Sequence, residues 1–155
     1  MTDQTIVHNT FVIARAYPKP VETVFAAFAE PAKKRRWYAQ SKDADTYEMD
    51  FRVGGIERAH SRMGASTPFP GATLANEGSH LDIVANARIV IASTMALDGR
   101  RFSASLATFA FAAAAKGTEL VFTHQGAFFE GADGPRMRED GWRALLDRLA
   151  AELAH

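Results

Sequence analysis

Residues 142–153 read Trp-Arg-Ala-Leu-Leu-Asp-Arg-Leu-Ala-Ala-Glu-Leu, and this stretch decides the fold. Its large apolar side chains recur at i, i+3, i+4, i+7 and i+11, which places them on one face of an α-helix of about four turns. The charged side chains occupy the other face. Such a helix must bury its apolar face against another element, and the chain before it offers a β-sheet.

The region before this helix predicts a series of strands joined by short turns. β-branched and aromatic residues alternate with polar ones over several segments, which is typical of half-buried strands. Asp98-Gly99 is a strong hairpin signal, because both central residues of the favoured two-residue turn need a positive φ. Each strand is therefore expected to pair with the one before it. The predicted strands cover residues 6–17, 47–53, 56–63, 73–84, 88–97, 102–114 and 118–128.

Two short helices are expected after the first strand. Pro18-Lys19-Pro20 ends that strand, and apolar residues then recur at helical spacing from Val21 to Phe28. Pro31 suits the first turn of a second helix, which ends at Trp37-Tyr38. Within it, Lys33–Arg36 is interpreted as a solvated helix face. The expected fold class is α+β: one domain over residues 6–154, with a curved antiparallel sheet of about seven strands and the C-terminal helix over its concave face.

Composition narrows the classes of function. Eighteen basic and eighteen acidic residues cancel, so no nucleic-acid partner is expected. The chain has no cysteine, which excludes disulfides, thiolate metal sites and a cysteine nucleophile. Residues 1–4 lack the features of a signal peptide, and no apolar run approaches the ~20 residues of a membrane span. A cytoplasmic location follows as the expectation.

Several short motifs resemble one known family. Asp50–Gly55 is similar to the D-x-R-x-G-G turn of the activator-of-heat-shock-protein-90-ATPase-like family, and Trp37 is similar to the tryptophan that ends the second helix of that family. Leu81–Val84 with Arg88–Val90, Gly117–Gly126, and Gly141-Trp142 with the leucines after it resemble later segments, in the same order. The family belongs to the START/SRPBCC superfamily, which shares a helix-grip fold with polyketide cyclases. The resemblance implies a protein that binds or sequesters a small apolar or amphipathic molecule.

Candidate residues for such a cavity fall into two groups. A long helix gripped by a curved sheet cannot touch the whole concave face, so large side chains or a ligand must fill the gap. The apolar candidates, for which plain core packing is the alternative, are Trp37, Phe51, Met95, Phe109, Phe128 and Trp142. The polar candidates, for which a solvent-exposed strand face is the alternative, are Arg58, His60, His80 and His124.

Other chemistry has little support in the sequence. The histidines show no ligand spacing, so neither a metal nor a cofactor is expected, and no catalytic residue is assigned. An enzyme of cyclase or hydrolase type would need a histidine inside the cavity. A chaperone or regulatory interaction module would instead expose an apolar patch, for which Phe128-Phe129 and Lys33–Arg36 are candidates. A homodimer through a sheet edge also stays open.

Overall fold

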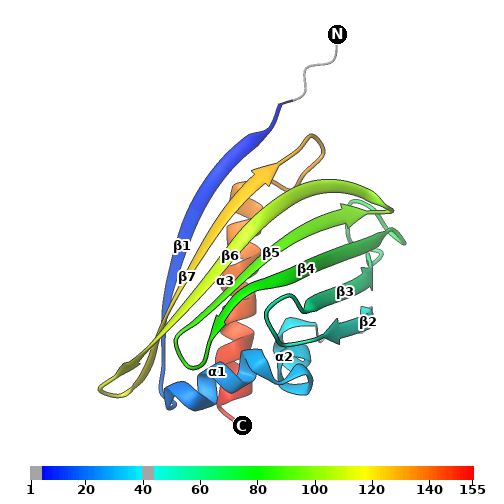
Figure 1. Cartoon of the computed structure of the whole chain (residues 1–155). Helices are drawn as coiled ribbons and strands as arrows, with labels where there is room; N and C mark the ends of the chain where they lie inside the picture. Colours follow the sequence, from blue (N-terminus) through cyan, green and yellow to red (C-terminus); the bar gives the residue numbers. More distant parts are fainter. Residues whose placement is uncertain (1–4, 40–43) are drawn as a thin grey trace.

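The computed structural model describes residues 5–39 and 44–155. Seven strands form one antiparallel sheet in the order β1-β7-β6-β5-β4-β3-β2, so sequence neighbours from β2 to β7 form a meander and β1 pairs with β7 at the far edge. The sheet is strongly curved, and the long helix α3 runs across its concave side (Figure 1). The elements are β1 (Val7–Tyr17), α1 (Val21–Ala29), α2 (Pro31–Tyr38), β2 (Ala44–Met49), β3 (Ile56–Arg62), β4 (Thr73–Val84), β5 (Arg88–Leu97), β6 (Arg100–Ala114), β7 (Gly117–Phe128) and α3 (Pro135–Leu153).

The predicted fold class is confirmed, and most strand boundaries agree within two residues. β4 and β5 have the predicted ends, and Asp98 and Gly99 turn the chain with φ values of 48° and 84°. The number of strands is as predicted, and each strand from β3 to β7 pairs with the one before it. The expected pairing fails for β2, which does not contact β1 in the sheet, because the two helices carry the chain to the opposite edge and β1 pairs with β7 instead.

The strand predicted over residues 47–53 is wrong in its second half. β2 ends at Met49, and the chain then turns through hydrogen bonds from Arg52 N to the Asp50 carbonyl (3.0 Å) and from Gly55 N to the Arg52 carbonyl (2.8 Å). Gly54 has a φ of 84°, and Val53 is 57% exposed. The prediction failed because the alternation of apolar residues continues past the end of β2 into this turn, whose geometry depends on Gly54 and Gly55.

The closing helix is longer than expected. α3 begins at Pro135 and spans 19 residues, although the residues up to Pro135 are turn formers and those after it carry few apolar side chains. Proline fits the first turn of a helix because its missing N–H would have no partner there. This extra length brings Arg138 over the sheet.

The core lies between the concave face of the sheet and the three helices. Phe28 of α1 packs against Trp37 of α2 and against Phe109 and Phe111 of β6, with ring centroids 5.0–5.2 Å apart. The Tyr17 hydroxyl donates to the Leu146 carbonyl (3.0 Å), which ties β1 to α3. α1 and α2 lie together at one end of the sheet (Figure 1). Among the described helices, none has the length and apolar character that a bilayer crossing requires.

Candidate functional site

A small cavity remains in the interior where α2 and α3 face the concave side of the sheet. Its volume is about 40 Å³, which is room for a few water molecules or a small organic group. The interior is therefore largely filled by side chains, and the space that remains is much less apolar than the sequence suggested. The lining residues are Lys34, Tyr38, Glu57, Asn76, Gly78, Ile91, Ser93, Met95, Ser105, Ala107, Phe109, His124, Arg138 and Trp142.

A buried ion pair forms one part of the wall. Lys34 of α2 places its Nζ 2.9 Å from Glu57 Oε2 of β3, and the two side chains are only 2% and 8% exposed. The ammonium also lies 4.5 Å from the centroid of the Tyr38 ring, where the negative face of the ring stabilises it. Lys34 is thus the one residue of the Lys33–Arg36 cluster that is buried, and the interpretation of the whole cluster as a solvated face is wrong there.

Two tyrosines extend this polar wall. The Tyr47 hydroxyl donates to Glu57 Oε2 (2.5 Å), while the Tyr38 hydroxyl accepts a bond from Asn76 Nδ2 (2.9 Å). Burial is the largest cause that raises the pKa of both phenols far above the usual range, and the nearby Glu57 carboxylate raises it further. Both hydroxyls therefore stay protonated and are able to donate a hydrogen bond, as Tyr47 does to Glu57.

Arg138, from the first turn of α3, adds a second polar part to the cavity wall. Its guanidinium binds both oxygens of Asp133 at 2.8 Å, and Nη2 also donates to Ser103 Oγ at 2.9 Å. The guanidinium carbon lies 5.0 Å from the centroid of the Phe128 ring. A bidentate carboxylate and an aromatic face hold the planar group in one orientation.

His124 of β7 is a cavity residue whose pKa is strongly lowered. Burial, followed by the positive charge of Arg138, lowers the pKa of His124 to about 4. Its ring stacks on Phe11 with centroids 4.7 Å apart, and Nδ1 is a buried atom without a hydrogen-bond partner among the described residues. A buried polar atom without a partner is costly, which makes it a candidate for a ligand or an ordered water.

The predicted site residues divide into three groups. Met95, Phe109, His124 and Trp142 line the cavity. Trp37 and Phe128 are buried beside it, and the Trp37 Nε1 donates to the Ala27 carbonyl (2.9 Å) inside the core.

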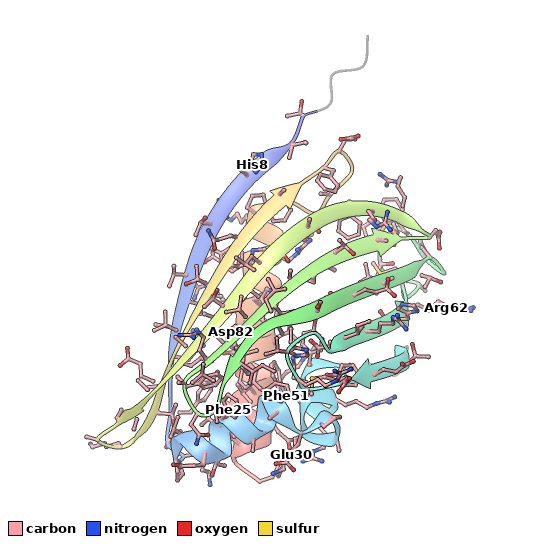
Figure 2. All side chains as sticks on the ribbon, viewed as in Figure 1. His8, Phe25, Glu30, Phe51, Arg62 and Asp82 are labelled. Atoms are coloured by element: carbon pink, nitrogen blue, oxygen red, sulfur yellow. The ribbon has the colours of Figure 1, made fainter. Side chains whose placement is uncertain are left out.

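The remaining predicted site residues lie elsewhere. Phe51 and His80 pack together with ring centroids 5.2 Å apart, and His80 Nδ1 lies 3.0 Å from the Gly55 carbonyl. Figure 2 shows Phe51 close to Phe25 of α1, at the end of the sheet where that helix lies. Arg58 and His60 project from the face of β3 opposite to Glu57, and both contact Glu77 (3.2 and 3.3 Å).

Sequence reasoning missed most of the polar wall. Lys34 precedes Trp37 by three residues, so both lie on the same face of α2, and this spacing was the available signal. Glu57 differs in parity from Arg58 and His60, so it projects from the other face of β3, which in the structure is the inner one. Arg138 gave no comparable signal because it lies outside the apolar periodicity of the closing helix.

The interaction patch suggested at Phe128-Phe129 is not present. Phe128 is buried beneath Arg138, and Phe129 is half-buried. Across residues 5–39 and 44–155, no group of three or more histidine, aspartate or glutamate side chains is placed to hold a metal ion.

Comparisons with known proteins identify the family. The family model described as Activator of Hsp90 ATPase homolog 1-like protein matches residues 18–154. None of the curated proteins compared with the chain matches it.

Solved structures agree with this match. An uncharacterised protein from Rhizobium leguminosarum is 38% identical, with 99% of each chain covered and a TM-score of 0.91. A protein from Rhizobium loti is 40% identical over 96% of this chain and 99% of the other, with a TM-score of 0.87. An AHSA1-like protein from Aeromonas hydrophila, 21% identical over 94% and 92% of the two chains, shares the fold with a TM-score of 0.66. The chain therefore belongs to the Activator of Hsp90 ATPase homolog 1-like protein family.

Proposed function

We propose that this protein binds a small amphipathic molecule in the cavity between α3 and the concave face of the sheet. One observation carries the proposal: a cavity lined by several polar side chains sits inside an otherwise aromatic core. Burying polar groups costs free energy unless partners satisfy them, so a core that served packing alone would place apolar residues there.

The two kinds of wall indicate how the ligand is oriented. Ile91, Phe109 and Trp142 provide apolar surface for its body. Hydrogen-bonding groups for its polar end come from Asn76, Ser93, Ser105 and His124. The hydroxyl oxygens of Ser93 and Ser105, on neighbouring strands, lie 3.2 Å apart. Polar groups that converge beside apolar surface are typical of small-molecule sites, and this cavity has a larger polar share than most.

The size of the cavity limits the ligand. A volume of about 40 Å³ is far below the 300–1,000 Å³ of typical drug-sized pockets. The ligand is therefore small, or Met95 and Trp142 move aside when it enters. Met95 suits such movement because its side chain is unbranched and flexible.

Binding is better supported than catalysis. A general base works best when its pKa lies near the working pH. The pKa of His124 lies at about 4, so its imidazole is neutral near pH 7 but a weak base. The same state is well suited to accepting a hydrogen bond from a ligand.

A cavity-filling variant tests the proposal. Ala107 lines the cavity, so Ala107→Leu should fill it, whereas Ala110 lies on the exposed face of the same strand and Ala110→Leu is the matched control. Native mass spectrometry of protein purified from its source organism should show a bound small molecule with the unaltered chain and with Ala110→Leu. That species should be lost with Ala107→Leu. Retention of the same molecule by a folded Ala107→Leu variant would place the binding site elsewhere.

A further inference from the structure

The charges around the cavity are balanced in pairs. Lys34 is matched by Glu57 at 2.9 Å, and Arg138 is matched by both oxygens of Asp133 at 2.8 Å. His124 adds no charge near pH 7, because burial and Arg138 lower its pKa to about 4. A charged ligand would therefore lose its hydration without meeting an unpaired counter-charge, which is unfavourable in a buried site.

Two side chains of the cavity wall still have hydrogen-bond donors available, although the charges of the wall are paired. The Tyr38 hydroxyl accepts a bond from Asn76 and, among the described residues, its own proton has no acceptor. Arg138 uses Nε and Nη2 for Asp133 and Ser103, and no contact within the described residues uses Nη1. Both side chains line the cavity.

We infer that the ligand is uncharged and presents a hydrogen-bond acceptor, such as a ketone, amide or ester carbonyl, to the Tyr38 hydroxyl and the Arg138 guanidinium. This inference rests on the proposed function and names the class of ligand. Asn76 fixes the Tyr38 oxygen, and Asp133 with Phe128 fixes the guanidinium. Because these contacts already fix the two donors, little side-chain entropy is lost when a ligand binds. Fixed donors also favour a ligand whose acceptor lies at one particular position.

Three probes that share a five-membered ring separate charge from hydrogen bonding: cyclopentanone, cyclopentanecarboxylate and cyclopentane. Binding is measured from the methyl NMR signals of Ile91 and Met95, which line the cavity, with the buried Ile13 methyls as the internal control. Cyclopentanone should shift the Ile91 and Met95 signals at the lowest concentration. Cyclopentane, which lacks the acceptor, should bind about 2- to 12-fold more weakly, the range that one hydrogen bond supplies. The carboxylate should also bind more weakly than cyclopentanone, because it loses its hydration without meeting an unpaired counter-charge.

A tyrosine variant identifies the donor. Tyr38→Phe should weaken the binding of cyclopentanone about 3- to 10-fold, within the range that one hydrogen bond supplies. The affinity for cyclopentane should be unchanged. Tyr17→Phe is the matched control, because the Tyr17 hydroxyl is bonded to Leu146 and does not line the cavity.

The outcomes distinguish the two proposals. Equal affinity for cyclopentanone and cyclopentane would contradict the inference that the ligand presents a hydrogen-bond acceptor. Tighter binding of the carboxylate would contradict the inference that the ligand is uncharged. In both cases the proposal that a ligand binds in the cavity would still hold. If none of the three probes shifts Ile91 or Met95, the proposed function fails and this inference fails with it.

Discussion

Lys34 Nζ lies 2.9 Å from Glu57 Oε2 in the interior of the protein, and this contact joins α2 to β3. The two residues are far apart in the sequence, and each is also held by aromatic neighbours: Lys34 by the Tyr38 ring and Glu57 by the Tyr47 hydroxyl. The pair thus fixes the position of α2 over the sheet at the wall of the cavity.

Lys34→Met should lower the free energy of unfolding by about 3 kcal/mol, because it leaves the Glu57 carboxylate buried without its cation. Urea denaturation followed by circular dichroism measures the loss. Lys33→Met is the matched control, since Lys33 pairs with Glu30 at the surface and should change stability by less than about 1 kcal/mol. Adding Glu57→Gln to Lys34→Met should restore part of the loss. Equal effects of the two lysine variants would show that burial of the pair has no energetic consequence.

His124 should make the protein less stable in mild acid. The folded protein binds a proton at His124 with a pKa of about 4, whereas the unfolded chain does so at about 6.5. Between these pKa values the unfolded state binds more protons than the folded state. The free energy of unfolding is therefore highest above pH 6.5 and falls as the pH drops towards 4. By pH 5 the loss should be about 2 kcal/mol, because only part of the difference between the two pKa values is expressed at that pH.

A variant isolates this contribution from other acid-sensitive groups. His124→Gln should show a shallower fall in the free energy of unfolding between pH 7 and pH 4.5 than the unaltered chain. His8→Gln, on the exposed part of β1, controls for the loss of a histidine. Parallel curves for the unaltered chain and His124→Gln would mean that His124 titrates normally in the folded state.

The two glycines of the turn after β2 should tolerate substitution very differently. A Cβ at Gly55 would lie 2.0 Å from the Asp50 carbonyl oxygen, so Gly55→Ala should cost more than about 3 kcal/mol or prevent folding. At Gly54 no atom lies within 4 Å, but φ is 84°, so Gly54→Ala should cost only about 1 kcal/mol. Thermal unfolding of both variants compares them directly, and a Gly55→Ala protein as stable as Gly54→Ala would refute the close contact.

The sequence predicted the sheet better than the cavity for a physical reason. The meander from β2 to β7 and the closing helix follow from local signals, such as the positive-φ turn at Asp98-Gly99 and the apolar spacing from Trp142 to Leu153. The pairing of β1 with β7 joins the two ends of the chain, and no local signal predicts it. The polar wall depends on pairs distant in the chain. A run of charges predicts a solvated Lys34, and only its partner on β3, Glu57, explains its burial.

The polar candidates show the same limit. The sequence does not distinguish Arg58, His60, His80 and His124, yet of these four only His124 lines the cavity. Parity along a strand says which residues share a face, but not which face meets the helix. Arg58 and His60 lie together, as parity requires, on the face away from the cavity with Glu77.

Gly126→Ala should disturb His124 directly. A Cβ at Gly126 would lie 2.8 Å from Phe128 Cε2 and 3.0 Å from His124 Cε1, so one of the two rings must move. Overpacking of this kind costs about 1–3 kcal/mol, and the displaced imidazole should gain contact with water. The NMR titration of the His124 ring should then move upward from about 4 towards its ordinary value.

Gly141→Ala is the matched control for that variant. Gly141 lies within α3 and no atom is within 4 Å of its Cβ position, so alanine should raise the free energy of unfolding by about 0.5–1 kcal/mol through helix propensity. The His124 titration should stay at about 4 in this variant. A shift of the His124 titration in both variants would mean that the imidazole responds to global stability, and the local packing of Phe128 and Gly126 would not be what holds it.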